Sequence, residues 1–314
     1  MLKNFALALT ALAGFAFCAL PAAAEMTALP KNVQQDIAAM GPNLNGEIVG
    51  KSVALLTPLL PPSPSPGITL TKDVSYGSDP AQNFDIYRPK GKNLPIAVFV
   101  HGGGFIGGDK NGSGPIYGNV TSYLSRHGIL ALNANYRLAA KAPWPAQAQD
   151  VGAVVAWLHA NAAQYGADAS RIVLIGHSAG ATDVAQYVLD ASQHPASGSG
   201  VAGAVLISGI YREAGILPPY KAYFGDDATQ YAKRLPASHV GEDKTPLFFV
   251  MAEYDPPFLA SDTPYLMSLV CARDGKCPPL SWLKGHNHLS ETMDIGSKDE
   301  TLGRQLVEFI KAAR

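Results

Sequence analysis

A serine between two glycines stands where a buried strand is expected to end. Residues 176–180 read Gly-His-Ser-Ala-Gly, after the apolar run 172–175 and before a helical stretch. In a strand–turn–helix of this kind the glycines let strand and helix approach closely, and the serine hydroxyl is exposed at the carboxyl edge of the sheet. The spacing predicts Ser178 as a nucleophile for acyl transfer. The alternative is a glycine-rich turn with an incidental serine.

Three consecutive glycines follow a second apolar strand. Residues 101–104 read His-Gly-Gly-Gly after the run 96–100. Their backbone N–H groups can approach a ligand closely, and in acyl transfer such donors stabilise the tetrahedral oxyanion, where the loss of one costs about 3 kcal/mol. We expect the N–H groups of Gly103, Gly104 and Ala179 to form this oxyanion hole. A phosphate-binding loop is the alternative, but no GxGxxG–helix spacing or P-loop lysine follows.

The nucleophile needs a base, and the base needs a carboxylate that orients it. Asp255 comes directly after the apolar run 247–251, at the carboxyl end of an expected strand. Glu253 and Asp262 are rivals, although Glu253 is still close to the strand and is expected to point elsewhere. We favour Asp255 as the orienting acid.

Two histidines follow the last expected strand. Residues 285–290 read Gly-His-Asn-His-Leu-Ser, so His286 and His288 are both candidate bases. We favour His288, because Leu289 after it could fix the loop to the core. The chain order Ser, Asp, His is the one expected where the serine stands on such a strand–helix turn.

Two further histidines flank these motifs. We expect His177 to pack or hydrogen-bond beside the serine, and His101 to support the glycine loop. No zinc-type ligand spacing occurs in the sequence, so we predict neither a metal nor another cofactor.

These residues require a sheet that brings strand ends together. Helical stretches at 115–127 and 145–164, and others beginning at Ser178 and near Lys298, alternate with short strand-like runs. The rhythm predicts one α/β domain with a largely parallel eight-stranded sheet covered on both faces. No helix separates the first two runs, which predicts an antiparallel edge. The strand-like runs lie at 71–76, 84–88, 96–101, 129–135, 172–176, 203–208, 246–252 and 280–284.

The segment before the sheet has a different character. Apolar residues at helical spacing, such as Val33 and Ile37, predict one or two helices over the active-site face, and the proline-rich stretch 61–67 follows as a stiff connector. A loosely ordered arm is the alternative. We therefore divide the chain into a helical cap with its connector at 25–67 and a catalytic domain at 68–314.

Residues 1–24 have the pattern of a cleaved secretory signal. Lys3 supplies a positive start, the run from Phe5 to Leu20 is almost wholly apolar, and small residues at 22–24 offer a cleavage site. A membrane anchor is the alternative. Cleavage predicts a protein exported to the periplasm or the medium. After removal of the leader, Cys271 and Cys277 are the remaining cysteines, and in an oxidising compartment we expect them to form a disulfide.

Composition excludes some partners. The chain has 314 residues, 47% of them hydrophobic and 16% charged. Removing the leader leaves 23 basic residues against 25 acidic ones, without blocks of like charge. Nucleic acid or an anionic membrane would require a basic stripe, so we expect neither as a partner. The oligomeric state is open, with a dimer as one possibility.

The ordered motifs resemble those of the hormone-sensitive-lipase-like carboxylesterases, especially the branch that includes feruloyl-esterase-like and kynurenine-formamidase-like hydrolases. The similarity runs from about residue 70 to the C-terminus. Besides the segments quoted above, it rests on Gly-Gly-Asp-Lys at 107–110, Asn-Tyr-Arg-Leu at 135–138 and Pro-Ala-Gln-Ala-Gln-Asp at 145–150. It implies the α/β-hydrolase fold, with Ser178 as nucleophile, Asp255 as acid and His288 as base. Family members often carry another acidic residue soon after the acid, whereas this chain has Pro256 and Pro257 there.

The resemblance implies a serine carboxylesterase for small to medium esters, since no long apolar lid occurs in the sequence. An amidase of the arylformamidase type would use the same residues, although export argues against tryptophan breakdown. A non-catalytic binding module is a further alternative, but such proteins usually lose the serine, the histidine or the oxyanion glycines.

Overall fold

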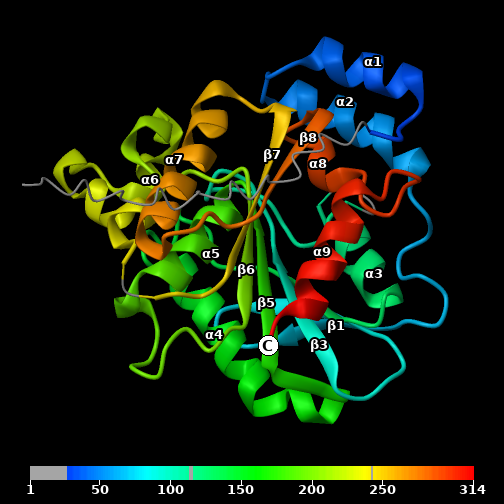
Figure 1. The fold of residues 1–314 in the computed structure, drawn as a ribbon, viewed down its shortest axis with the longest axis horizontal. Coiled ribbons are helices and arrows are strands. Elements are labelled where there is room, and N and C mark those ends of the chain that lie inside the picture. Colours follow the sequence, from blue (N-terminus) through cyan, green and yellow to red (C-terminus); the bar gives the residue numbers. More distant parts are fainter. Residues whose placement is uncertain (1–26, 113–115, 242) are drawn as a thin grey trace, which may run out of the picture.

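The structure is a computed structural model that describes residues 27–112, 116–241 and 243–314. An eight-stranded sheet in the order β1-β2-β4-β3-β5-β6-β7-β8 forms its centre (Figure 1). Strand β2 pairs antiparallel with β1 and β4, and the remaining neighbours are parallel. The predicted α/β-hydrolase fold with an antiparallel edge is confirmed. The strands are β1 Thr69–Ser75, β2 Asn83–Arg88, β3 Leu94–Val100, β4 Leu130–Ala134, β5 Ala167–His177, β6 Gly203–Ile207, β7 Leu247–Tyr254 and β8 Leu280–Asn287.

The central strands are buried on both faces, which explains why their sequences are apolar throughout. Every residue of β3 is buried. Because successive side chains point to opposite faces, Ile96 and Val98 join one core cluster while Ala97 and Phe99 join the other. Two separate cores therefore hold the sheet between layers of helices.

Helices cover both faces of the sheet. The core that contains Ile96 includes side chains from α4, α5 and α7, and the core that contains Phe99 includes side chains from α3 and α9. Figure 1 shows these two groups on opposite sides of the strands. The helices are α1 Lys31–Met40, α2 Gly46–Leu56, α3 Gly118–Arg126, α4 Ala146–Asn161, α5 Ala179–Leu189, α6 Lys221–Phe224, α7 Pro257–Asp274, α8 Ser290–Met293 and α9 Thr301–Ala312. Short 3-10 helices lie at Thr57–Leu59, Ala162–Tyr165, Ala191–Gln193, Glu213–Gly215, Pro218–Tyr220, Ala228–Gln230, Ala232–Arg234 and Pro236–His239.

The sequence analysis did not predict helix α7. Pro257 stands at its first position, where the missing N–H is harmless, and Pro264 lies inside the helix. An internal proline normally argues against a helix. Here Leu266 and Val270 are buried in the core of the sheet, so packing stabilises a helix that its own sequence disfavours.

Helices α1 and α2 lie at the carboxyl end of the sheet, beside α8 and β8 (Figure 1). Asn45 caps α2, because its side chain accepts a hydrogen bond from the N–H of Ile48. Ile37 and Leu56 are completely buried in a third apolar cluster, which Leu289 of the His288 loop also joins. The N-terminal helices therefore pack directly against the loop that carries the candidate base.

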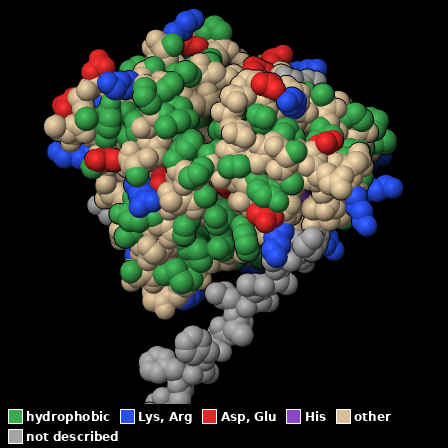
Figure 2. All heavy atoms as spheres, turned by 90° about the horizontal axis from the view of Figure 1, so that it is seen from above, with side chains coloured by type: hydrophobic (Ala, Val, Ile, Leu, Met, Phe, Trp, Pro, Cys, Tyr) green, Lys and Arg blue, Asp and Glu red, His purple; other side chains and the backbone are tan. Residues whose placement is uncertain are grey.

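The predicted signal sequence lies outside the described residues. In the described part, Cys271 in the last turn of α7 forms a disulfide with Cys277, which lies just beyond the helix. No helix within the described ranges is both long and apolar enough to span a bilayer. On the face seen in Figure 2, basic and acidic side chains are interspersed.

Candidate active site

The turn between β5 and α5 holds Ser178 in a strained conformation. Its φ of 57° and ψ of −122° place it between the strand and the first residue of the helix, and its N–H donates to the carbonyl of Ile207 in β6 at 2.8 Å. A Cβ at Gly180 would lie 2.3 Å from the carbonyl oxygen of Val100. Only glycine therefore allows α5 to approach β3 this closely, and the turn has the geometry of a nucleophile elbow.

Asp255 and His288 meet at the carboxyl ends of β7 and β8. The Nδ1 atom of His288 lies 2.9 Å from Oδ1 of Asp255, and both side chains are buried. This hydrogen bond assigns the proton to Nδ1 and leaves Nε2 as the acceptor, which is the tautomer a general base requires. Ser178 and His288 line the same cavity.

The rival acids have other partners. Glu253 is exposed and accepts the N–H of Gly285 at 2.8 Å. Asp262 is buried in α7, where its carboxylate accepts hydrogen bonds from the N–H of Tyr211 and the guanidinium of Arg212. Neither carboxylate contacts His288, so Asp255 is the acid that the geometry supports.

The rival base, His286, belongs to a separate polar cluster behind the loop. Its Nε2 lies 3.5 Å from Asp299 and 3.9 Å from Asp294. Burial disfavours the charged imidazole, but these two carboxylates outweigh burial and raise the pKa of His286. Asp299 also accepts hydrogen bonds from Thr27 and from the N–H of Ala28, so the cluster ties the start of the described chain to the core.

The glycine loop lies beside Ser178. Gly103 has a φ of 136°, and a Cβ there would lie 2.0 Å from the carbonyl oxygen of Gly107, so a side chain cannot be accommodated. Gly103 and Gly104 line the cavity that contains Ser178. Ala179 is the first residue of α5, where an N–H has no partner within the helix. Two of the three predicted donor residues therefore line the same cavity as the nucleophile, and the third follows it directly in the chain.

Two histidines support these loops from behind. His101 stacks on Tyr136 with ring centroids 4.5 Å apart, and its Nδ1 lies 2.7 Å from the carbonyl of Gly102. The Nε2 of His177 lies 2.9 Å from the carbonyl of His288. Burial lowers the pKa of both imidazoles, and for His177 the nearby His288 lowers it further. Both rings are therefore neutral, and Nε2–H of His177 donates to the His288 loop.

The sequence analysis missed two polar residues at this site, Ser208 and Glu291. The Ser208 hydroxyl lies 2.7 Å from Oδ2 of Asp255 and 3.0 Å from Oε2 of Glu291, and both residues are fully buried. Ser208 directly follows β6, so the rule that located Asp255 after β7 could have found it. Glu291 is three residues beyond His288, and its distance from any strand end hid it.

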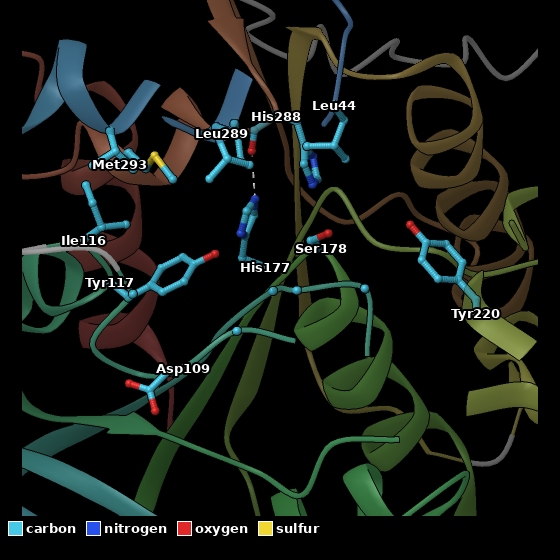
Figure 3. A pocket seen from close by; sticks show the side chains of 17 residues that line it. Leu44, Asp109, Ile116, Tyr117, His177, Ser178, Tyr220, His288, Leu289 and Met293 are labelled. Carbon is cyan, nitrogen blue, oxygen red and sulfur yellow. Dashed lines mark hydrogen bonds between the residues drawn. The ribbon is translucent and has the colours of Figure 1, made fainter. Parts of the chain in front are cut away.

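A cavity of about 480 Å³ opens in front of Ser178. Figure 3 shows Ile116 and Met293 on one side of the serine and Tyr220 on the other. Helix α2 and the turn before it contribute further apolar side chains, and Asp109 adds one acidic group. The lining residues from this segment are Leu44, Val49 and Val53.

Histidines and carboxylates gather in two groups whose ligand-type atoms lie within 4.8 Å of one another. Hydrogen bonds within the protein already engage both groups. His177 donates to the carbonyl of His288, while the Nδ1 of His286 lies 3.2 Å from the hydroxyl of Ser290. We interpret them as proton-sharing networks instead of metal sites. The groups are His177, His288 and Glu291, and His286, Asp294 and Asp299.

Comparison with known sequences identifies relatives among esterases. The family model described as BD-FAE matches residues 84–189, which include the glycine loop and Ser178. Esterase LipC of Mycobacterium tuberculosis is 39% identical over 111 residues, which cover 34% of this chain and 27% of LipC. Esterase LipQ of the same organism is 27% identical over 209 residues, which cover 59% of this chain and 49% of LipQ. The chain thus spans about half or less of the length of these two relatives.

Solved structures share the fold. The hyperthermophilic esterase of the archaeon Pyrobaculum calidifontis superposes with a TM-score of 0.66 at 22% identity, covering 90% of this chain and 98% of that one. A truncated carbohydrate esterase from gut microbiota superposes with a TM-score of 0.65 at 21% identity, covering 81% of this chain and 98% of that one.

The Asp255–His288 hydrogen bond predicts how Ser178 reacts. In Asp255→Asn the amide no longer stabilises the imidazolium and favours the wrong tautomer of His288, so we expect fluorophosphonate labelling of Ser178 to slow by about 10⁴-fold. The measurement is the labelling rate of the purified protein. Glu253→Gln is the matched control and should label at the wild-type rate. Slow labelling of Glu253→Gln together with wild-type labelling of Asp255→Asn would show that Glu253, and not Asp255, is the orienting acid.

Proposed function

Because the chain has the α/β-hydrolase fold and resembles the hormone-sensitive-lipase-like carboxylesterases, we propose that it is a carboxylesterase with Ser178 as its nucleophile. The observation that carries this proposal is the hydrogen bond between His288 and Asp255, beside a cavity that also contains Ser178 and the glycine loop. The esterase relatives support the same class of reaction.

The proposed reaction is a two-step acyl transfer. Oγ of Ser178 attacks the ester carbonyl while Nε2 of His288 takes its proton, and Asp255 stabilises the resulting imidazolium. The carbonyl electron pair moves onto the oxygen, which accepts hydrogen bonds from the loop at Gly103 and Gly104 and from Ala179. When the tetrahedral intermediate collapses, His288 returns the proton to the leaving alcohol.

Water then completes the cycle. His288 removes a proton from a water molecule that attacks the acyl carbonyl carbon. The bond from that carbon to Oγ of Ser178 then breaks, His288 returns the proton to Oγ, and the carboxylic acid leaves. The ring of His177 packs close to His288 and is neutral. It therefore does not oppose the positive charge that His288 acquires in this cycle, as a positively charged neighbour would.

We propose small to medium esters as substrates. The cavity of about 480 Å³ lies at the lower end of the range for small-molecule sites. Val49, Val53 and Met293 give one wall an apolar surface suited to a short acyl or alcohol group. An amide of similar size would use the same residues, and the substrate panel below separates the two.

Export remains a proposal that the disulfide supports. A bridge between Cys271 and Cys277 persists in an oxidising compartment, whereas cytosolic thiols are kept reduced. We expect the N-terminus of the protein purified from its native cells, determined by mass spectrometry, to lie close to Glu25. A mature protein that begins at Met1 would refute cleavage.

Hydrolysis of a p-nitrophenyl ester series tests the function. We expect the highest kcat/KM at acetate or butyrate, a decline towards palmitate, and complete loss in Ser178→Ala. A matched anilide series tests amide cleavage. Turnover of no ester, with fluorophosphonate still labelling Ser178, would show a reactive serine that serves another substrate class. Full activity of Ser178→Ala would refute the mechanism.

Helix α2 forms the wall of the cavity at which we expect the length of the substrate's acyl chain to be selected. Val53 lines the cavity, whereas its neighbour Ala54 is exposed on the outer side of the helix. Val53→Phe should reduce the space for the substrate and lower kcat/KM for hexanoate by at least about tenfold relative to acetate, on the scale of discrimination by one or two methylenes. Ala54→Phe is the control and should leave the ratio unchanged. Equal ratios in both variants would place the acyl group elsewhere.

A further inference from the structure

The hydroxyl of Ser208 lies between two buried carboxyl groups. Its Oγ is 2.7 Å from Oδ2 of Asp255 and 3.0 Å from Oε2 of Glu291. A hydroxyl has one hydrogen to donate, so it cannot satisfy two ionised carboxylates at once. Since the contact with Asp255 is shorter, the Ser208 hydrogen points to Asp255. The hydrogen in the second contact must then come from Glu291.

The surroundings of Glu291 disfavour a negative charge. Among the described residues, Asp255 and Asp294 are the acidic groups that face it, Tyr211 lies nearby, and its Oε1 is 3.3 Å from His177 and 3.5 Å from His288. Burial and the charge of Asp255 raise the pKa of Glu291 well above its usual range. The remaining oxygen, Oε1, has no hydrogen-bond partner, and a buried ionised oxygen without a donor is costly.

We propose that Glu291 is a positioning residue that retains its proton and donates it to Ser208, which in turn holds Asp255 against His288. This inference rests on the proposed function, because it assigns Glu291 a role in the same reaction. The chain of donors runs from Oε2–H of Glu291 to Oγ of Ser208, and from the Ser208 hydroxyl to Oδ2 of Asp255. Nδ1–H of His288 donates to the other oxygen, Oδ1.

The proton on Glu291 keeps a single negative charge next to His288. An ionised Glu291 would place a second carboxylate 3.5 Å from Nδ1, where it would compete with Asp255 for the same hydrogen. It would also favour the charged imidazole in the resting enzyme, and a protonated His288 cannot accept the Ser178 proton. As a neutral donor, Glu291 fixes the orientation of Asp255 without either effect.

Replacement of Glu291 by glutamine separates the two protonation states. The glutamine amide is neutral, has nearly the same shape and can donate an N–H to Ser208. We expect Glu291→Gln to retain kcat within about threefold and to leave the acidic limb of the kcat/KM pH profile unchanged. If Glu291 were ionised, its removal would take away a negative charge beside His288 and move that limb about one pH unit or more to lower pH. That shift would overturn the proposal.

Variants that interrupt the chain from Glu291 through Ser208 to Asp255 test whether it positions Asp255. Ser208→Ala and Glu291→Leu should each lower kcat about 10- to 100-fold with KM nearly unchanged, because binding does not involve either residue. The double variant should be no slower than Ser208→Ala, since both changes break one chain. Multiplied losses in the double variant would refute the chain. Glu253→Gln, which changes an exposed acid near the carboxyl end of β7, is the control and should retain wild-type kcat.

Infrared spectroscopy detects the proton on Glu291 directly and does not depend on an activity assay. At pH 7 the wild-type spectrum should contain a carboxylic-acid C=O band that is lost in Glu291→Gln, while the bands of other protonated acids remain in both. An unchanged acid band would overturn the proposal. The readout also separates two failures: a wild-type protein that hydrolyses no ester refutes the proposed function, whereas the infrared result still decides the protonation of Glu291.

Discussion

The carboxylate of Asp255 joins the parts of the site that come from different strands. Oδ1 faces Nδ1 of His288, which follows β8, while Oδ2 accepts the N–H of Ala252 in β7 and the hydroxyl of Ser208 after β6. Asp255 is only 4% exposed, so its charge depends on these donors in place of water. The same group that orients the candidate base therefore links the carboxyl ends of three neighbouring strands.

The buried carboxyl group of Glu291 adds an electrostatic constraint behind this pair. A charge at Asp255 is compensated by three donors, whereas an ionised Glu291 would bring a second charge with no hydrogen left to stabilise it, because the hydrogen of Ser208 already points to Asp255. The lower-energy arrangement is one charged and one neutral carboxyl group, with a serine hydroxyl between them. Behind the loop, burial raises the pKa of Asp294 to about 7, whereas hydrogen bonds from His286 and Thr27 outweigh burial and lower the pKa of Asp299.

Much of the fold and the site could be predicted from local sequence. The eight strand-like runs, the antiparallel edge and the positions of Ser178, Asp255 and His288 after strand ends all follow from apolar patterning and from the rule that parallel strands end at one edge. Helix α7 could not be predicted, because Pro264 opposes a helix and the burial of side chains such as Leu266 and Val270, which stabilises it, is a tertiary contact. The segment between β6 and β7 folds as short 3-10 helices and the four-residue helix α6, which are too short to carry a periodic signal of their own.

The sequence by itself determined the types of reactive groups and their order along the chain, because both depend on the glycines and strand ends next to each residue. It left Glu253, Asp262 and His286 as rivals, since neighbours in sequence reveal nothing about the direction in which a side chain points. Tertiary structure decided between them by giving each rival another partner. It alone placed Glu291 and Ser208 beside Asp255, because their contacts join segments that are 47 and 83 residues apart. Such proximity arises only when β6, β7 and β8 pair and the loops beyond them pack together.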